Sequence, residues 1–448
     1  MKVKERTAII GTGISGLACA HFLQGDFDLT LFEKDDRIGG HSNTVEVPEN
    51  GRMLPLDTGF MVYNEVTYPH LTRLFKELNV ATKPTAMSFS VQHMLAGIEF
   101  NGGSVNLLFS QRKNLLSPRF WKMLLQINRF NKETVEELAN PKFGDLSLAE
   151  YVKARGYGSD FLEWYLSPMA AAVWSSPPER IDSFPARTLM RFWHNHGFLG
   201  LDTQHPWRTV SGGSREYVKK ITAPFADRIV KGNAVTAVNG TTITLADGTT
   251  HTFDKVIFAS HGDQSLALLT APTPLETEIL TPFEYQPNKA VVHTDPRFMP
   301  STRRAWASWN YRVDANGKHS THYWMNNLQG VSKNENYFVS INPPAGIPDE
   351  KVIHRLNYEH PLFTAAAITA QSRIPELHEA ARITHRHYCG AWQRYGFHED
   401  GIWSAHRLCK QILNQDPWRQ SSGSCSDSTN RQGRTPESQR QIASAQPN

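Results

Sequence analysis

The sequence has few cysteines, little net charge and no long hydrophobic run, and each shortage excludes a class of protein. A disulfide framework or a zinc site requires paired or regularly spaced cysteines. Neither pattern occurs among the four cysteines, which are Cys19, Cys389, Cys409 and Cys425. We therefore expect no metal. The formal charge of +4 comes from 47 Lys and Arg against 43 Asp and Glu, an excess too small to indicate a nucleic-acid partner.

The hydrophobic runs are too short to indicate a membrane span or a secretion signal. No stretch approaches the roughly 18 apolar residues of a spanning helix, and the charged start MKVKER leads only into the short run AIIG. Cysteines without a pairing pattern fit a reducing compartment. We therefore expect a cytoplasmic protein, either free or resting on a membrane surface, and the 448 residues suggest two or three domains.

A glycine-rich turn near the N-terminus has the features of a dinucleotide-binding unit. An apolar run at 7–10 precedes it, a helical pattern follows at 17–23, and a second apolar run at 29–32 ends in an acid. The glycines of such a turn permit a tight bend, a close approach of backbone to pyrophosphate, and close helix–strand packing, while the acid accepts from a ribose hydroxyl. A purely structural turn is the alternative. The predicted contacts are Gly11, Gly13, Ile14, Ser15, Gly16 and Glu33.

The residues that follow Glu33 distinguish FAD from NAD. They read KDDRIGGHSNTVEV and then LDTGFMVYN. Here the sequence resembles the flavin-containing amine oxidase superfamily, in which an acid, a following Arg and a glycine pair extend the cradle under FAD. Many relatives carry Arg directly after the glycine pair, where this chain has His41, which either lines the flavin face or is an ordinary loop histidine. The resemblance implies FAD as cofactor, with contacts at Lys34, Arg37, Gly39, Gly40, His41, Asp57, Gly59 and Phe60.

A second glycine-and-acid motif lies far downstream, in YCGAWQRYGFHEDGIWSAHRLCKQIL at 388–413. Superfamily members end with a glycine, a loop past the flavin ring, and an acid with glycine at a helix N-terminus. An acid at a helix start is also favoured by the exposed N–H groups, so helix capping alone is the alternative. The resemblance implies cofactor contacts at Gly390, His398, Glu399, Asp400 and Gly401.

Two hairpin signals in the middle of the chain indicate a small sheet on the nucleotide domain. They are NG at 239–240 and DG at 247–248, set between runs of Val, Thr and Ile. In the superfamily a valine here lies along the adenine, which Val235 matches, and Ala259 matches a strand end that approaches the cofactor closely. Plain strand core is the alternative for Val235.

These motifs predict an α/β fold: a Rossmann-type FAD-binding domain, as in two-dinucleotide-binding-domain flavoproteins, interleaved with an α+β substrate domain. Residues 416–448, rich in Ser, Gln and Arg with few apolar side chains, are expected to form a disordered tail. The expected boundaries are 1–65, 205–275 and 375–415 for the FAD-binding domain and 66–204 and 276–374 for the substrate domain.

Aromatic-rich segments between these motifs narrow the resemblance to a bacterial subgroup of predicted NAD/FAD-binding oxidoreductases, whose members often sit beside cyclopropane-fatty-acid-synthase-like methyltransferases. The resemblance implies an FAD-dependent oxidase, dehydrogenase or desaturase that transfers a hydride from a lipophilic substrate, such as a methylated fatty acyl chain, to flavin N5. No second GxGxxG follows a strand, so oxygen or a quinone is the expected electron acceptor. The alternatives are a flavin amine oxidase and a non-catalytic FAD-binding scaffold.

Three residues are candidates for the catalytic centre. Flavin amine oxidases place a lysine near flavin N5 on a strand comparable to the one that holds Lys289, while Trp392 and Tyr395 lie on the loop that should pass the flavin ring. The alternatives are an exposed strand-end lysine and aromatic side chains of an ordinary core.

The segment 104–130 mixes basic and apolar residues, and two interpretations fit it. A basic, apolar helix is typical of a segment that lies on an anionic bilayer, which would give peripheral membrane contact. Apolar spacing at 120, 123, 124, 127 and 130 equally fits an amphipathic helix packed on its own core, and this second interpretation is the one we favour.

Overall fold

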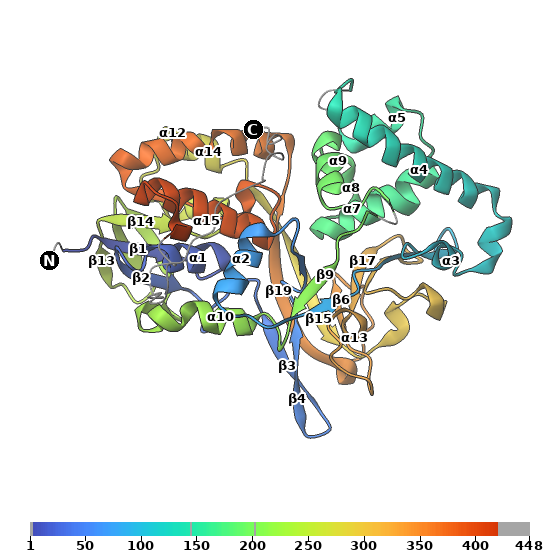
Figure 1. The fold of residues 1–448 in the computed structure, drawn as a ribbon, viewed down its shortest axis with the longest axis horizontal. Coiled ribbons are helices and arrows are strands. Elements are labelled where there is room, and N and C mark those ends of the chain that lie inside the picture. The colour runs from blue at the N-terminus through green and yellow to red at the C-terminus, as the bar shows by residue number, and fades with distance from the viewer. Residues whose placement is uncertain (1–2, 144–145, 201–202, 420–448) are drawn as a thin grey trace, which may run out of the picture.

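The structure, a computed structural model, describes residues 3–143, 146–200 and 203–419, with the backbone alone at 178–179. One layer is a five-stranded parallel sheet in the order β10–β2–β1–β14–β20 (Figure 1). Its central strand β1 is buried and reads as an apolar run, as expected of a sheet covered on both faces. The strands are β1 (Arg6–Ile10), β2 (Asp28–Glu33), β10 (Ile229–Lys231), β14 (Lys255–Phe258) and β20 (Arg386–Tyr388).

Helices cover both faces of this sheet. On one face, a single apolar core joins β1 and β2 to α1 (Ile14–Leu23), α2 (Pro69–Glu77), α10 (Arg215–Thr222) and α15 (His398–Leu413). The other face packs against α11 (Gly262–Leu268), α12 (Pro274–Leu280), α14 (Ala365–Thr384) and a small antiparallel sheet. That sheet is β11 (Val235–Asn239), β12 (Thr242–Leu245) and β13 (Thr250–Thr252), so both predicted hairpins are confirmed.

A seven-stranded mixed sheet in the order β19–β15–β18–β17–β16–β7–β8 forms the second part of the molecule. Its long antiparallel pair β15–β19 extends toward the nucleotide domain (Figure 1). The hairpin β3 (Thr44–Glu49) and β4 (Arg52–Asp57) packs on one face of this pair. The strands are β7 (Phe89–His93), β8 (Ile98–Asn101), β15 (Glu284–His293), β16 (Trp309–Val313), β17 (His319–Trp324), β18 (Phe338–Ile341) and β19 (Val352–Leu362).

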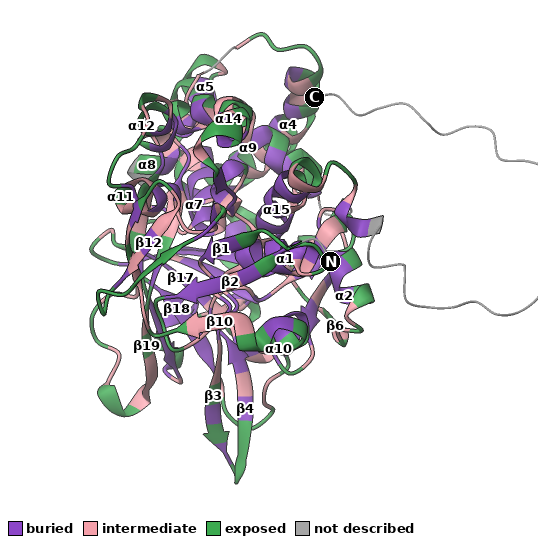
Figure 2. Cartoon of the chain, turned by 90° about the vertical axis from the view of Figure 1, so that its left-hand side faces the viewer, coloured by how far each residue is buried: buried purple, intermediate pink, exposed green. Residues whose placement is uncertain are grey.

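A group of helices from one stretch of chain packs beside this sheet, and buried residues alternate along these helices with exposed ones (Figure 2). The aromatic core of this region includes Phe130, Tyr151, Phe161 and Trp193. The helices are α3 (Val105–Leu108), α4 (Pro118–Ala139), α5 (Leu148–Ala154), α6 (Ser159–Phe161), α7 (Ser167–Trp174), α8 (Pro178–Asp182) and α9 (Ala186–Asn195). The remaining elements are β5 (Tyr63–Asn64), β6 (Thr82–Thr85), β9 (Trp207–Val210) and α13 (Met325–Leu328).

The α/β fold with its Rossmann-type domain is confirmed, and the domain boundaries stay a prediction. Two of the predicted limits, at 275 and 375, fall inside α12 and α14, which pack together against the parallel sheet. The start of the predicted tail is ordered, because Trp418 is only 4% exposed and packs edge-on against Phe22 with ring centroids 4.7 Å apart. Residues 420–448, including Cys425, lie outside the described part of the chain. Among the described helices, none combines the length and apolar character that a bilayer span requires.

Candidate functional site

The N-terminal glycine turn leaves the start of helix α1 open. Gly11 has φ +102°, and a Cβ on Gly16 would lie 2.0 Å from the Gly11 carbonyl oxygen, so both positions require glycine. Gly13 is the N-cap of α1, and within this described helix there is neither a side-chain cap nor an acid in the first turn. A Cβ on Gly13 would meet no atom within 4 Å. The first N–H groups of α1 therefore face open space, which suits an anion.

The loop after β2 closes over this helix start. The Arg37 guanidinium donates to the carbonyl oxygens of Ile38, Gly40 and Ser42, at 3.3, 2.9 and 3.3 Å. Arg37, a predicted FAD contact, thus holds its own loop together through these hydrogen bonds. An ideal Cβ on Gly40 would lie 2.9 Å from the Cα of Gly13, so the loop packs directly against the turn.

Glu33 lies at the end of β2 with its carboxylate on the glycine turn. One oxygen accepts from the Thr12 backbone N–H at 3.1 Å and from its hydroxyl at 2.5 Å, and the other accepts from the Asp35 N–H at 3.2 Å. Lys34, the next residue, is exposed. Ala259, at the end of β14, brings its carbonyl oxygen to 3.0 Å from an ideal Cβ on Gly11, whereas Val235 lies half-buried at the margin of the core on the other sheet face.

The two ends of the chain meet where α1 and α15 begin. An ideal Cβ on Gly401 would lie 2.6 Å from Ile14 Cγ2 and 3.0 Å from Ser15 Oγ, so only glycine allows this approach of the two helix starts. Asp400 is 4% exposed and accepts from the Phe397 N–H at 2.9 Å, the capping contact that was the alternative interpretation. Burial raises the Asp400 pKa to about 7.

Glu399 does not face this junction. Its carboxylate accepts from the backbone N–H groups of His70 and Leu71, at 3.1 and 3.0 Å, and lies 2.8 Å from His70 Nδ1. These donors form the N-terminus of α2, so Glu399 caps a neighbouring helix. Adjacent side chains in the first turn of α15 point in different directions. The sequence alone does not tell which of Glu399 and Asp400 faces the junction of α1 and α15.

His398 links three distant segments beside the cradle. Its Nε2 lies 2.9 Å from Ser42 Oγ and 2.8 Å from the Tyr217 hydroxyl, and its ring stacks on Phe60 with centroids 3.9 Å apart. Burial lowers the His398 pKa to about 3, so the imidazole is neutral. The predicted residues Phe60 and His398 are thus in mutual contact.

Asp57 begins the D-x-G turn at residues 57–59, and hydrogen bonds from other parts of the chain hold its carboxylate. Its carboxylate accepts from the Ser214 N–H at 2.9 Å, the Ser214 hydroxyl at 2.8 Å and the Gln329 amide at 2.6 Å. Gly59 packs on the preceding loop, since a Cβ there would lie 2.2 Å from the carbonyl oxygen of His41. The D-x-G turn therefore fixes the position of His41 in this structure.

His41 belongs to a partly buried polar cluster beside the cradle, and its place at the flavin face stays a prediction. Its ring stacks on Tyr358 with centroids 5.1 Å apart and lies 5.4 Å from the His360 ring. His360 Nδ1 is 2.7 Å from the amide nitrogen of Asn288, whose oxygen accepts from Asn342 at 2.6 Å. Burial lowers the pKa of His41 to about 4 and that of His360 to about 3. Within the described structure, the buried Nε2 of His41 has no protein partner.

Lys289 is not brought to this cluster. It is exposed on β15, whereas the adjacent Asn288 is 2% exposed and contacts His360. Successive side chains of a strand point to opposite faces, so the two residues cannot share a surface. Asn288 lies on the same strand face as the buried Ala290 and Val292, but Val291 and His293 are buried as well, so the sequence pattern offers no signal to prefer Asn288 over Lys289.

Trp392 and Tyr395 do not form a pair of facing walls. Trp392 is 2% exposed in the nucleotide-domain core, donates to the Ser260 carbonyl at 3.1 Å and covers Gly390. Tyr395 packs against the helical core, with its ring centroid 5.6 Å from that of Phe192. The intervening turn directs the two aromatic rings into different cores.

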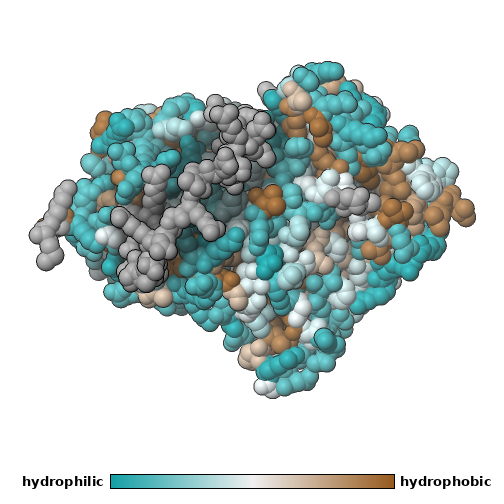
Figure 3. Space-filling model, in the orientation of Figure 1, coloured by the Kyte–Doolittle hydropathy of each residue, from teal (hydrophilic) through white to brown (hydrophobic). Residues whose placement is uncertain are grey.

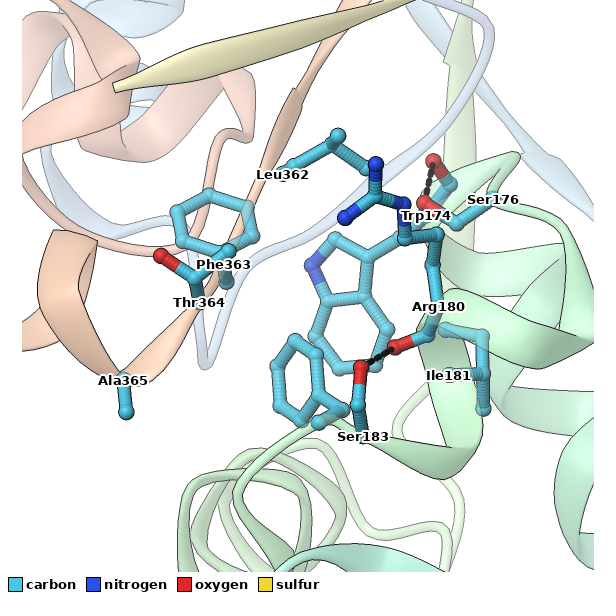
Figure 4. Close-up of a pocket in the computed structure, with 10 residues that line it drawn as sticks. Trp174, Ser176, Arg180, Ile181, Ser183, Leu362, Phe363, Thr364 and Ala365 are labelled. Carbon is cyan, nitrogen blue, oxygen red and sulfur yellow. Dashed lines mark hydrogen bonds between the residues drawn. The ribbon is translucent and has the colours of Figure 1, made fainter. Parts of the chain in front are cut away.

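Two neighbouring pockets lie where the helices meet the seven-stranded sheet, and Ser176 lines both. The smaller, of about 170 Å³, is mainly apolar (Figure 4). The larger, of about 460 Å³, includes Gln286 and Asn342, and Asn342 connects it through Asn288 to the histidine cluster. The smaller pocket is lined by Trp174, Ser176, Arg180, Ile181, Ser183, Phe184, Leu362, Phe363, Thr364 and Ala365.

Comparison with known proteins agrees with this geometry. A model of the flavin-containing amine oxidoreductase family matches residues 14–334. The chain belongs to this family. Cyclohexylamine oxidase from Brevibacterium oxydans has the same fold, with a TM-score of 0.64 at 15% identity, over 92% of this chain and 100% of that one.

Two curated relatives of this chain are oxidases. It is 27% identical over 199 residues to protoporphyrinogen oxidase 2 of Arabidopsis thaliana and 24% identical over 182 residues to coproporphyrinogen III oxidase of Staphylococcus aureus. Each match covers 40% of this chain, and the chain matches only 35% and 38% of the length of these relatives.

The family membership confirms a flavin cofactor, and the cradle fits FAD. The open N-terminus of α1 suits a pyrophosphate, Glu33 lies against the glycine turn through its bond from the Thr12 N–H, and the unpartnered Nε2 of His41 offers a polar contact. The family match ends at residue 334, so the placement of α15 beside the cradle rests on the contacts of Gly401 and His398. No group of three or more metal-ligating side chains occurs in the described ranges.

Proposed function

We propose that this protein is an FAD-dependent oxidoreductase acting on a lipophilic substrate that carries a negative group, such as a methylated fatty acyl chain. The observation that supports this proposal is the lining of the two pockets. Among the side chains that the structure describes there, Arg180 and Lys318 are basic, and none carries a carboxylate. A site of this kind attracts an anionic group and repels an ammonium ion.

The two pockets would bind different parts of the substrate. The smaller supplies apolar surface from Trp174, Phe184 and Phe363, which suits a hydrocarbon. The larger has mostly hydroxyl, amide and basic groups, which suit a polar head. Because Ser176 lines both, one elongated molecule that is apolar at one end and polar at the other fits the pair.

An amine substrate is less well supported. Amine oxidation requires the substrate nitrogen to be held between aromatic walls, and Trp392 and Tyr395 lie in different cores. Carboxylated tetrapyrroles, on which the two curated relatives are named as acting, satisfy the charge argument as well as an acyl chain does. They form a second candidate class.

Bound FAD would supply the acceptor for a hydride, and oxygen or a quinone would then take the electrons. The residues of the chain would orient the substrate and exclude water from it. Neutral His41 and His360 lie between the cradle and Asn288, and Asn342 continues the hydrogen-bonded series to the larger pocket. With pKa values near 4 and 3, both histidines offer neutral donors and acceptors at physiological pH.

Anaerobic titration of the purified full-length flavoprotein tests the proposal. A methyl-branched fatty acid is compared with the alkylamine of the same chain length and with coproporphyrinogen, and the loss of the oxidised flavin absorbance is followed. We expect the acid to reduce the flavin and the amine to leave it oxidised. The double variant Arg180→Gln, Lys318→Gln should need about tenfold more acid, equivalent to about 1.4 kcal/mol.

Three results would contradict this assignment. Reduction by the amine alone would identify an amine oxidase, and reduction by the porphyrinogen alone would identify the second candidate class. A flavin that stays bound and oxidised with every compound would instead indicate the non-catalytic scaffold.

A further inference from the structure

Large apolar side chains are exposed together on the outer side of the helical region. Leu116 is 89% exposed and Leu125 67% exposed; a single exposed leucine is ordinary, whereas a group of exposed apolar residues indicates an interaction surface. Figure 3 shows hydrophobic surface gathered on the right-hand side of the molecule, where Figure 1 places α3 and the nearby end of α4. We call this the outer patch; its members are Met94, Leu95, Val105, Leu115, Leu116, Trp121 and Leu125.

The α4 helix has apolar residues on two faces. Phe120, Met123 and Phe130 are fully buried, as the core interpretation of the sequence requires. Trp121 and Leu125 are four residues apart, so they share a second face, and this face is exposed. One helix thus satisfies the internal core and still presents an apolar stripe outward.

Contacts between neighbouring segments make the outer patch continuous. Trp121 Nε1 donates to the Leu115 carbonyl at 2.9 Å, which ties α4 to the turn at 112–116. Arg112 donates to the Asn106 side chain at 2.8 Å, which ties that turn to α3. Lys113 Nζ lies 3.7 Å from an ideal Cβ on Gly97, next to the hairpin turn that carries Leu95.

The charge around the outer patch has one sign. Residues 104–132 contain six Lys and Arg and no Asp or Glu, although the whole chain has a formal charge of only +4. Two of these charges are offset, because Arg119 forms a salt bridge with Asp160 at 2.5 Å and Arg129 forms one with Glu133 at 2.7 Å. Lys113 and Lys122 are exposed beside the apolar residues.

We propose that the outer patch docks this protein onto an anionic lipid bilayer, with the leucines and Trp121 in the headgroup region and the lysines on the lipid phosphates. Exposed apolar residues among basic ones are the combination that binds such an interface. A second copy of this chain suits the surface less well, because a two-fold contact would bring the same basic residues face to face. The inference goes beyond the proposed function and is independent of the substrate.

Sedimentation of the full-length flavoprotein with lipid vesicles tests the proposal. Vesicles of phosphatidylglycerol and phosphatidylcholine in equal parts are compared with phosphatidylcholine alone. We expect binding to the first that weakens as salt is added, and little binding to the second. Lys113→Gln with Lys122→Gln should lower the partition coefficient by about thirtyfold, and Leu116→Ser with Leu125→Ser by about tenfold.

The matched control is Val135→Ser, which changes an apolar residue of α4 that is 49% exposed but lies beyond the outer patch. It should leave binding unchanged. The proposal is overturned if the wild type binds neither vesicle, binds both equally, or loses binding through Val135→Ser as much as through the patch variants. Concentration-dependent dimers that Leu116→Ser dissociates, without vesicle binding, would assign the surface to self-association.

Discussion

Gly13 allows the cradle to be tested separately from the fold, because it has free space where its neighbours have none. An alanine Cβ at this position meets no atom within 4 Å, and its φ of −68° and ψ of 179° are accessible to any residue. The same atom on Gly16 would lie 2.0 Å from a carbonyl oxygen. Gly13→Ala should therefore fold normally and place its methyl group where a pyrophosphate approaches α1.

The expected effects on stability and binding differ. Replacing glycine reduces the entropy of the unfolded chain by about 0.4–1 kcal/mol, while loss of glycine from an N-cap costs about 0.5–1 kcal/mol, so the free energy of unfolding of the apoprotein should change by less than about 1 kcal/mol. Displacing one charge-assisted N–H to phosphate hydrogen bond costs about 1.5–3 kcal/mol. The Kd for FAD should then rise roughly tenfold to a hundredfold.

The assay titrates apoprotein with FAD and follows quenching of the flavin fluorescence, alongside urea unfolding of the apoprotein. Gly25→Ala is the matched control, because a Cβ there also meets nothing within 4 Å and the residue lies just beyond the opposite end of α1. The reasoning is refuted if Gly13→Ala binds FAD as tightly as the wild type, or if it unfolds as readily as Gly16→Ala.

Three further variants separate structural from cofactor roles. Glu399→Gln should destabilise the fold by about 1–2 kcal/mol in urea unfolding, because it weakens the cap of α2, and leave the Kd for FAD unchanged; a large loss of FAD affinity would return Glu399 to the cradle. Lys289→Ala should leave the rate at which oxygen reoxidises the photoreduced flavin unchanged, and a marked slowing would contradict its outward placement. The raised Asp400 pKa of about 7, against 3.8 for the ordinary carboxyl, means that the unfolded chain loses this proton first, so apoprotein stability should fall as pH rises from 4 to 7, by roughly 1.4 kcal/mol per unit at most. Asp400→Asn should remove this part of the pH dependence, which unfolding at several pH values measures; an unchanged profile would show that Asp400 is ionised in the folded state.

Much of the nucleotide domain could be predicted because its constraints act within short segments. A glycine turn between two buried strands, with an acid at the end of the second, leaves few alternatives for the backbone, and the structure places Gly11, Gly16 and Glu33 accordingly. The turn chemistry of 239–240 and 247–248 likewise determines its hairpins locally.

Side-chain direction was the part that local patterns predicted poorly. Lys289 and Asn288 are adjacent in a strand, yet Asn288 contacts His360 while Lys289 is exposed. Glu399 and Asp400 are adjacent in a helix turn, yet Glu399 caps α2 while Asp400 contacts Phe397. A shift of one residue reverses the face of a strand, so locating a strand in the sequence does not by itself tell which of two neighbouring residues faces inward.

The sequence by itself determined the class of fold, the glycine turn before α1 and the core-facing stripe of α4, since these depend on backbone conformation and periodicity within a few residues of one another. Only the tertiary structure decided which helix Glu399 caps, that His41 joins His360 and Asn288, and that Trp121 is left exposed. Each of these outcomes depends on which distant segment packs against the residue, and packing partners hundreds of residues apart are selected by the shape and burial of the whole molecule.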